Sequence, residues 1–543
     1  MKRSNIKNYA LALLAFAGLS SCTDLEIEES DSFISAGFQG LEDPESALTG
    51  LLGAVAGQLG DQANTYALRE VTTDAQLVPT RGADWGDNGR WRNLHTHEWG
   101  LEAADIIGPF DQWNANQLAA SQILDARSNA SAETMAGAYF VRAYAMWTIL
   151  DFYGQVPFRD TSLSSSELPT VLSGAAAVDF ILADLDNAVA GLPTVAAGSG
   201  DDLQDPSKAA ARFLQAKVLL NRHIYENQLA GGGGTANPAD MQAVIGLVDQ
   251  ITADGFAIEQ NGYFEIFRNS PDTETIWWTN TGVGNRIFNT MHYNSFSEGG
   301  GGWNGFSTLA EYYDLFEGDP NSNDVALDES PMSAQEERRG GVPPSGLPFT
   351  GREGTNDENG FETGSNVGNG FLLGAQYNLD GTQTLDRPGD LLFFTRDFVD
   401  NDGNSNLINN SEQTGIRVIK YNPRFGAFTA HSIQFRYADA HLMRAEAMMR
   451  MGNDPTAMVN ELRAARANTP PLGSVGEQEL ADERARELFT EGWRRNDMIR
   501  FGTYLRDWEL KAPGEVQNQT RLLFPIPLPQ VLANPNLVQN SGY

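Results

Sequence analysis

The sequence predicts a mainly α-helical protein: a scaffold of tetratricopeptide-like helical hairpins, joined to a loop-rich region with short strands. Apolar residues recur every three or four positions before about residue 262 and again after residue 431, which is the spacing of helices with one buried face. Between these parts, short β-like runs lie within long tracts rich in Gly, Asn, Asp and Pro. Loops of this length are uncommon in compact domains unless they carry a function. Length alone would allow about two to four domains.

The N-terminal part contains several segments with helical periodicity and recognisable helix ends. Pro44 fits the first turn of one helix, Ser131 is placed to cap another, and Gly154 follows that second helix where it should end. The predicted helices are residues 43–60, 105–126, 131–154, 175–191, 207–227 and 241–253. The stretch 81–99 is expected to be rich in loop, and the glycine run 231–234 is interpreted as a linker.

The C-terminal part returns to helical spacing and ends in a Pro-rich, extended tail. We expect helices at 435–453, 454–468 and 479–502. Segment 136–154 with 178–190, and 433–452 with 456–467, form pairs in the style of tetratricopeptide hairpins, although the strict repeat signature is absent. Small residues should permit close packing in the second pair, namely Ala438, Ala440, Ala445 and Ala447.

Tryptophans outside the loops have predictable environments. Trp113 and Trp147 lie on apolar helix faces and should be in the core. Trp277 and Trp278 are adjacent in a strand-like run, so one ring should point inward and the other outward.

The N-terminus has the features of a lipoprotein signal. Three basic residues within the first seven precede an apolar run at 9–19, which is too short for the roughly 20 residues of a transmembrane helix. Leu19–Cys22 is interpreted as a lipobox, which predicts a signal peptide at 1–21 and lipid attachment to Cys22. The alternative is an ordinary secretory signal with a chance cysteine. Because Cys22 is the only cysteine, its acylation would exclude disulfides, zinc-thiolate sites and cysteine nucleophiles.

The chain is strongly acidic. Its formal charge is -34, and removal of the three basic residues of the signal would leave about -37. Such a surface repels nucleic acid and anionic lipid headgroups, so neither is an expected partner. The simplest interpretation is solubility in a saline habitat.

Several motifs, taken together and in order, resemble one known family. They are "FDQWNANQLAASQIL", "YFVRAYAMWTILDFYGQVPF", "SKAAARFLQAKVLLNRHIY", "GIRVIKYNP", "FRYADAHLMRAEAMMRMGN", "RARELFTEGWRRNDMIRFG" and "FPIPLPQVLANPNLVQNSGY". On these residues the chain resembles the SusD/RagB family, the surface lipoproteins of Bacteroidetes-type nutrient-uptake systems. One departure is "DLFEGDPNSND", where the family usually places an arginine soon after an aspartate; the nearest arginines here are Arg338 and Arg339.

The resemblance implies a binding protein without catalysis. The expected architecture is an acidic tether at 22–42 followed by a single SusD-like domain at 43–543, whose parts are 43–262, 263–430 and 431–543. Such a protein would sit as a lid on a TonB-dependent, SusC-like outer-membrane barrel, facing the cell exterior, and deliver a captured oligosaccharide or peptide to it. The acids that follow Cys22 resemble an export tag; the alternative is a solvated linker. Trp493, in the motif "EGWRR", should be structural.

Two regions are candidates for ligand binding. Sugars need aromatic faces for their C–H surfaces, together with amides, carboxylates or arginines for their hydroxyls. In the family the binding aromatics come from the loop 81–99 and from the Gly-rich segment near 298–306. The candidate residues are Trp85, Arg90, Trp91, Asn93, Trp99, Tyr293, Trp303 and Asn304. The alternative for any one tryptophan is a packing role.

Other chemistry has weaker support. The acidic loops at Asp319 and Asp400 are candidates for a structural calcium ion but lack full EF-hand spacing. His95 and His97 form either a metal pair or, more simply, part of a wet loop. No catalytic or nucleotide-binding motif occurs, so no cofactor is expected. A surface glycoside hydrolase, which needs two carboxylates across the sugar, and a peptide-binding helical scaffold remain as alternatives.

Overall fold

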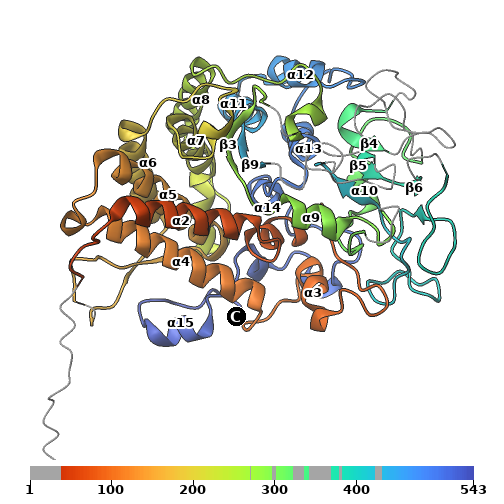
Figure 1. Ribbon diagram of the computed structural model, residues 1–543, viewed down its shortest axis with the longest axis horizontal. Coiled ribbons are helices and arrows are strands. Elements are labelled where there is room, and N and C mark those ends of the chain that lie inside the picture. The colour runs from red at the N-terminus through yellow and green to blue at the C-terminus, as the bar shows by residue number, and fades with distance from the viewer. Residues whose placement is uncertain are drawn as a thin grey trace, which may run out of the picture.

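The computed structural model describes residues 38–164, 166–268, 271–295, 301–321, 335–341, 368–377, 382–421 and 431–543. Cys22 and most of the predicted tether lie outside these residues. The fold is mainly helical, with short strands in small sheets, as the sequence predicts (Figure 1). No helix in the described ranges combines the length and the apolar character needed to cross a membrane.

The six helices predicted in the N-terminal part are all present, and each packs on the next. They are α2 (Pro44–Gly60), α4 (Ala104–Leu124), α5 (Ala132–Tyr153), α6 (Gly174–Gly191), α7 (Lys208–Tyr225) and α8 (Pro238–Ala253). The predicted helix ends are confirmed. The Ser131 side chain accepts a hydrogen bond from the Thr134 N–H, and Gly154 ends α5 with φ 72°. Helices α5 and α6 form the predicted hairpin, and Gly191 permits their close approach because a Cβ there would lie 2.7 Å from the Ala136 Cβ.

The C-terminal helices lie against this stack. They are α11 (Tyr437–Arg450), α12 (Thr456–Ala464), α13 (Glu477–Leu488), α14 (Arg494–Arg500) and α15 (Leu528–Ala533). Helix α11 packs on α7, α8, α12 and α13, and the four small residues predicted to permit this are fully buried.

Two predictions for this part are wrong in detail. The expected helix 479–502 is two helices, because Thr490 and Gly492 have φ values of 60° and 81°, which no α-helix accommodates. The tail that was expected to be extended contains the short helix α15.

The strands are short and mostly antiparallel pairs. β3 (Thr275–Thr279) pairs with β9 (Ser432–Arg436), and β1 (Gln155–Phe158) pairs with β2 (Thr170–Ser173). β4 (Gly340–Gly341), β5 (Asn369–Leu372) and β8 (Arg417–Ile419) form one sheet, and β6 (Gly374–Ala375) pairs with β7 (Phe393–Phe394). On β3, Trp277 is buried and Trp278 is partly exposed, but the register is irregular between them and Trp278 also packs against the core, so the strict alternation that was predicted is absent from this strand.

Short helices complete the described chain. They are α3 (Arg90–Thr96), α9 (Val283–Thr290), α10 (Ala310–Tyr313), a π-helical turn at Ala67–Val71 and 3-10 turns at Asp87–Gly89, Ala126–Ser128, Gly200–Leu203, Gln228–Ala230, Tyr263–Phe267, Glu337–Arg339, Pro513–Glu515 and Gln519–Leu522. Helix α3 and the turn before it occupy residues 87–96 of the stretch 81–99, and the rest of that stretch is the loop that was expected.

Two hydrophobic cores result. One lies within the helical stack and contains Trp113, Trp147 and Trp493, as predicted. The other lies under the loop-rich region, which Figure 1 shows to the right of the helical stack, and includes Phe371, Ile416 and Phe489.

A buried ion network joins the two cores. Its members are Glu274, Glu483, Glu487, Glu491, Arg338, Arg436, Arg463 and Arg466. At its centre, the Glu487 carboxylate accepts from Arg338 at 2.9 Å, from Arg436 at 2.7 Å and from Arg466 at 2.8 Å. Arg338, which follows the departure from the family pattern, is therefore a structural member of this network.

Candidate ligand-binding face

Trp85 and Trp303 are held together by a specific backbone arrangement. Trp85 has φ 60°, a left-handed conformation that is rare for a bulky residue. Its indole N–H donates to the Trp303 carbonyl at 2.6 Å. The ring covers Gly305, where a Cβ would lie 2.4 Å from Trp85 Cε2. Only glycine therefore fits beneath this ring.

Trp303 has a fixed backbone and an open side chain. Its N–H donates to the Phe288 carbonyl at 2.9 Å, near the end of α9, and the next N–H, of Asn304, donates to Met291 at 2.8 Å. The Trp303 side chain is nevertheless 51% exposed. An exposed indole on a fixed backbone is a ready stacking platform.

A polar cluster surrounds Tyr293. The Tyr293 hydroxyl donates to Asp84 Oδ2 at 2.6 Å, and the Arg387 guanidinium lies 3.5 Å from the centre of the tyrosine ring. Arg387 also donates to Asp84 at 3.2 Å and, from its backbone N–H, to Glu412 Oε2 at 3.0 Å. Segments more than 300 residues apart in the sequence thus share one cluster. Sequence reasoning missed Arg387 and Glu412, because no local motif surrounds either residue.

Glu412 is ionised and fully engaged. His292 Nδ1 accepts from the Asn294 N–H at 3.1 Å, so the ring proton is on Nε2 and is donated to Glu412 at 3.0 Å. Burial would raise the pKa of Glu412, but hydrogen bonds from His292 and Arg387 outweigh it and lower the pKa to about 2. This carboxylate therefore supplies negative charge, not a proton.

Exposed apolar side chains border the cluster. They belong to a segment that we call the rim, residues 385–394, and are Leu385, Leu391 and Phe393. The Asn294 side-chain amide donates to the Leu385 carbonyl at 2.9 Å, which joins the rim to the Tyr293 segment.

Two buried arginines, Arg81 and Arg417, support the face from below, and we call them the arginine clamp. Arg81 donates to the carbonyls of Asn304 and Thr414, both at 2.7 Å. Arg417 donates to the Asn304 side-chain oxygen and to the Glu412 and Thr414 carbonyls, each at 2.8 Å. The clamp thereby fixes the loops at residues 304 and 412–415, where no long strand does so.

Comparisons with known proteins agree with this architecture. The model of the SusD family matches residues 273–543. The chain belongs to the SusD/RagB family.

Curated SusD-like relatives match over shorter segments. The starch-binding protein SusD of Bacteroides thetaiotaomicron is 44% identical over 119 residues, which is 20% of this chain and 21% of the relative. The SusD-like protein P38 of Formosa agariphila is 33% identical over 125 residues, which is 20% of this chain and 24% of that protein. The chain thus spans less than a quarter of the length of these relatives in the matched segments.

Solved SusD-like structures match over nearly the whole chain. A SusD-like protein from Bacteroides fragilis has a TM-score of 0.65 at 17% identity, covering 92% of this chain and 98% of that one. The surface glycan-binding protein A of Bacteroides uniformis has a TM-score of 0.63 at 17% identity, with 92% and 98% coverage. A laminarin-binding SusD-like protein has a TM-score of 0.56 at 18% identity, with 93% and 100% coverage. At these identities the likeness establishes the fold alone.

The predicted site residues of this SusD-like chain separate into two groups. Trp85, Tyr293 and Trp303 come together on the face described above. Trp91 and Trp99 are each only 3% exposed and lie in the core of the helical stack, so neither ring is open to a ligand. Trp91 donates to Asp87 at 3.0 Å and Trp99 to the Tyr543 hydroxyl at 2.8 Å, which corresponds to the packing alternative.

The polar candidates also separate. Asn304 is fully buried within the arginine clamp and positions Trp303 instead of reaching the surface. Arg90 pairs with Asp105 at 2.6 Å, and Asn93 is exposed on the same helix, α3. Neither is joined to the Tyr293 cluster by a hydrogen bond in the described chain.

His95 and His97 do not lie in the wet loop expected for them. Both are fully buried, and their Nε2 atoms lie 3.0 Å from the Glu509 carbonyl and 2.8 Å from the Thr72 carbonyl. Burial lowers the pKa of His95 to about 4. Each ring is thus held separately by a backbone carbonyl.

The two calcium candidates have local explanations. The Asp400 carboxylate accepts from the backbone N–H groups of Asp402 and Asn404, both at 2.9 Å, and Asp319 accepts from the Asn321 N–H at 2.9 Å. Such Asx turns need no ion. Among the residues that the structure describes, no group of three metal-ligating side chains occurs.

Proposed function

We propose that this protein captures an oligosaccharide at the face around Trp303 and hands it to a partner TonB-dependent, SusC-like outer-membrane barrel without catalysis. The observation that carries the proposal is the half-exposed Trp303 indole, held beside the hydrogen-bonded cluster of Tyr293, Asp84 and Arg387.

The chemistry of this face suits a sugar. The apolar C–H surface of a pyranose stacks on an indole, and its hydroxyls need donors and acceptors of fixed direction. Arg387 is 48% exposed, so its guanidinium remains accessible while Tyr293, Asp84 and Glu412 hold it in place. A preorganised face binds without the cost of ordering its own side chains.

The carboxylates of this face do not support hydrolysis. A glycosidase needs one carboxyl group with a raised pKa to protonate the leaving oxygen. Glu412 has a pKa of about 2, and Asp84 accepts from both Tyr293 and Arg387. Both carboxylates are thus occupied in shaping the face, which agrees with binding alone.

The names of similar proteins support a glycan over a peptide. One relative is a starch-binding protein, and two proteins of the same fold are a surface glycan-binding protein and a laminarin-binding protein. Lipid attachment at Cys22, with the body facing the cell exterior, would place such a binding face at the source of extracellular glycans.

Replacement of Trp303 tests the binding face. Trp303→Ala should weaken binding to glycans found on an array at least tenfold, about 1.4 kcal/mol, because the stacking platform is lost. The free energy of unfolding should change by less than about 0.5 kcal/mol, because the ring is half exposed and the carbonyl that holds Trp85 remains.

Leu532→Ala is the matched control, since Leu532 is 76% exposed on α15 and shares no contact with this face. Calorimetry should show unchanged binding for the control. Equal binding by Trp303→Ala and wild type would reject the site, and binding of peptides but no glycan would reject the ligand class.

Lipid attachment and partnership need a separate measurement. Cys22→Ser should abolish incorporation of labelled palmitate, release the protein from the membrane and end its copurification with a barrel protein of the outer membrane. Palmitate labelling that persists in the variant would contradict the assignment of Cys22.

A further inference from the structure

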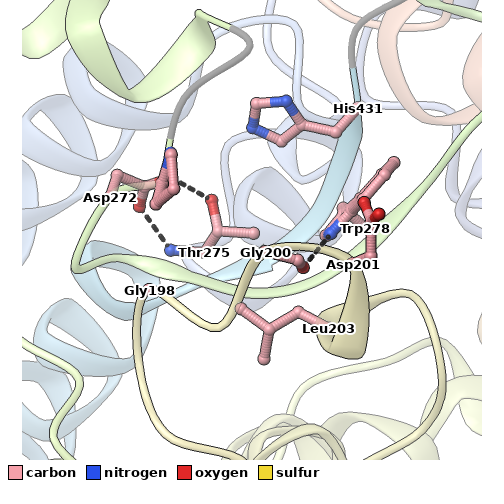
Figure 2. A pocket seen from close by; sticks show the side chains of 9 residues that line it. Gly198, Gly200, Asp201, Leu203, Asp272, Thr275, Trp278 and His431 are labelled. Carbon is pink, nitrogen blue, oxygen red and sulfur yellow. Dashed lines mark hydrogen bonds between the residues drawn. The ribbon is translucent and has the colours of Figure 1, made fainter.

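A cavity lies away from the Trp303 face, between the α6–α7 connection and the β3–β9 pair (Figure 2). Its volume is about 260 Å³. Its lining includes Gly198, Gly200, Asp201, Asp272, Trp278 and His431. It shares no lining residue with the Trp303 face.

Trp278 forms a positioned wall of this cavity. Its indole N–H donates to the Gly200 carbonyl at 3.1 Å, and its ring meets His431 edge-on, with centroids 5.4 Å apart. The side chain is partly exposed, whereas that of the preceding Trp277 is buried. Trp278 is therefore fixed by two neighbours while part of its surface borders the cavity.

The opposite side of the cavity presents carboxylate oxygens and the backbone of a glycine-containing loop. The Asp272 carboxylate accepts from the Glu274 and Thr275 N–H groups, both at 2.7 Å, which fixes its direction (Figure 2). Gly200 has φ 59°, and a Cβ there would meet no atom within 4 Å, so the loop leaves room beside it. The exposed Asp201 stands at this loop beside Trp278.

The charge of the lining restricts the ligand. Among the described residues that line the cavity, two are carboxylates and none is Lys or Arg. The His431 ring is buried, so it adds no fixed positive charge at neutral pH. Sulfated, phosphorylated or uronic acid sugars are therefore disfavoured.

We infer that this cavity binds one neutral sugar residue, as a second site that operates independently of the Trp303 face. An indole offers a surface for the ring C–H groups, and carboxylate and carbonyl oxygens accept from the hydroxyls. The volume lies just below the roughly 300–1,000 Å³ of pockets for drug-sized ligands, which suits a single ring and not a chain segment.

The test uses the mature chain carrying Trp303→Ala. Binding at the cavity is then measured by itself, whether or not the Trp303 face binds glycan. Methyl glucoside, methyl galactoside, methyl mannoside, glucuronate and glucosamine are titrated by saturation-transfer NMR, and crystals are soaked with the best binder. At least one neutral glycoside should bind with a dissociation constant on the order of 1 mM, and its density should lie against Trp278. Binding of none of them, or of charged sugars alone, overturns the inference.

Two neighbouring aspartates provide a matched pair of variants. Asp201 lines the cavity and Asp202 does not, and both side chains are exposed, so neither substitution should unfold the chain. Asp201→Arg should reduce the affinity at least tenfold by obstructing the cavity, whereas Asp202→Arg, with the same change of charge, should leave it unchanged. Equal affinities in the two variants would place the ligand elsewhere and overturn the assignment.

Discussion

Two groups of buried arginines, those of the ion network and those of the arginine clamp, differ in their partners. In the ion network each arginine meets carboxylates: Arg436, for example, reaches Glu274, Glu487 and Glu491. Despite burial, these carboxylates raise the pKa of Arg436. In the arginine clamp the partners are neutral carbonyl, amide and hydroxyl oxygens, and burial lowers the pKa of Arg81 to about 9.

The difference shows two uses of the same side chain. Paired charges of the ion network connect helices and strands of the two cores, where removal of one partner leaves another charge buried. The clamp instead supplies several directed N–H groups from one planar guanidinium to carbonyls of irregular loops, which have few strand partners. One region holds rigid elements together, and the other substitutes for secondary structure beneath the binding face.

Removal of Glu487 should have the largest effect on stability. Glu487→Ala would leave Arg338, Arg436 and Arg466 without their shared partner, at a cost of about 3–5 kcal/mol in the free energy of unfolding. Urea denaturation measures this loss in the free energy of unfolding. Glu477→Ala, an exposed glutamate on the same helix, should cost less than about 1 kcal/mol. Similar losses in both variants would mean that the network contributes little.

Truncation of the clamp should have a smaller effect on stability but an added effect on binding. Arg417→Ala would leave the Glu412 and Thr414 carbonyls without this donor and should cost about 2–4 kcal/mol. Because Asn304 loses its anchor, the affinity for glycan should fall as well. Arg417→Lys should not restore binding, since an ammonium cannot reproduce the planar fork.

If Arg417→Ala reduces stability but the fully folded variant binds glycan with wild-type affinity, the clamp does not position Trp303. Calorimetry at a temperature where both proteins are fully folded separates the two effects.

Glu70 provides an effect of the opposite sign that depends on pH and vanishes near pH 4.5. It accepts from the Gly492 N–H at 2.6 Å, but its other oxygen has no hydrogen-bond partner in the described chain. Burial raises its pKa to about 8, whereas the unfolded value is near 4.5. Between these values the folded state holds a proton that the unfolded state releases, so this group stabilises the fold less as the pH rises.

Glu70→Gln removes that penalty and keeps the acceptor for Gly492. The variant should match wild type near pH 4.5, and its advantage in the free energy of unfolding should grow with pH to about 4 kcal/mol at pH 8. A difference that stays constant from pH 4.5 to pH 8 would show that Glu70 is ionised in the folded protein.

The helices were predictable because periodicity and end signals are local, as at Ser131 and Gly154. The burial of Trp91 and Trp99 was not foreseen, because the spacing in 81–99 shows neither that α3 turns the Trp91 ring inward nor that the chain after α3 packs the Trp99 ring into the core. Arg387 and Glu412 could not be found at all, since they lie 94 and 119 positions beyond Tyr293 in the sequence and meet it only in the folded chain. The clamp escaped prediction for the same reason: a buried arginine with neutral partners carries no local pattern.

The rim has a consequence for how such proteins diversify. Its exposed side chains, Leu385, Leu391 and Phe393, contribute little to either core. The segment is held by the buried Leu392 and Phe394 and by backbone bonds, such as those from the Gln376 N–H to the Leu392 carbonyl and from the Leu392 N–H to the Thr384 carbonyl. The backbone hydrogen bonds that hold the rim do not depend on the identity of its exposed side chains. Under the proposed function, selectivity for different glycans can therefore be changed at these exposed positions by mutation or directed evolution, while the buried arginines beneath maintain the fold.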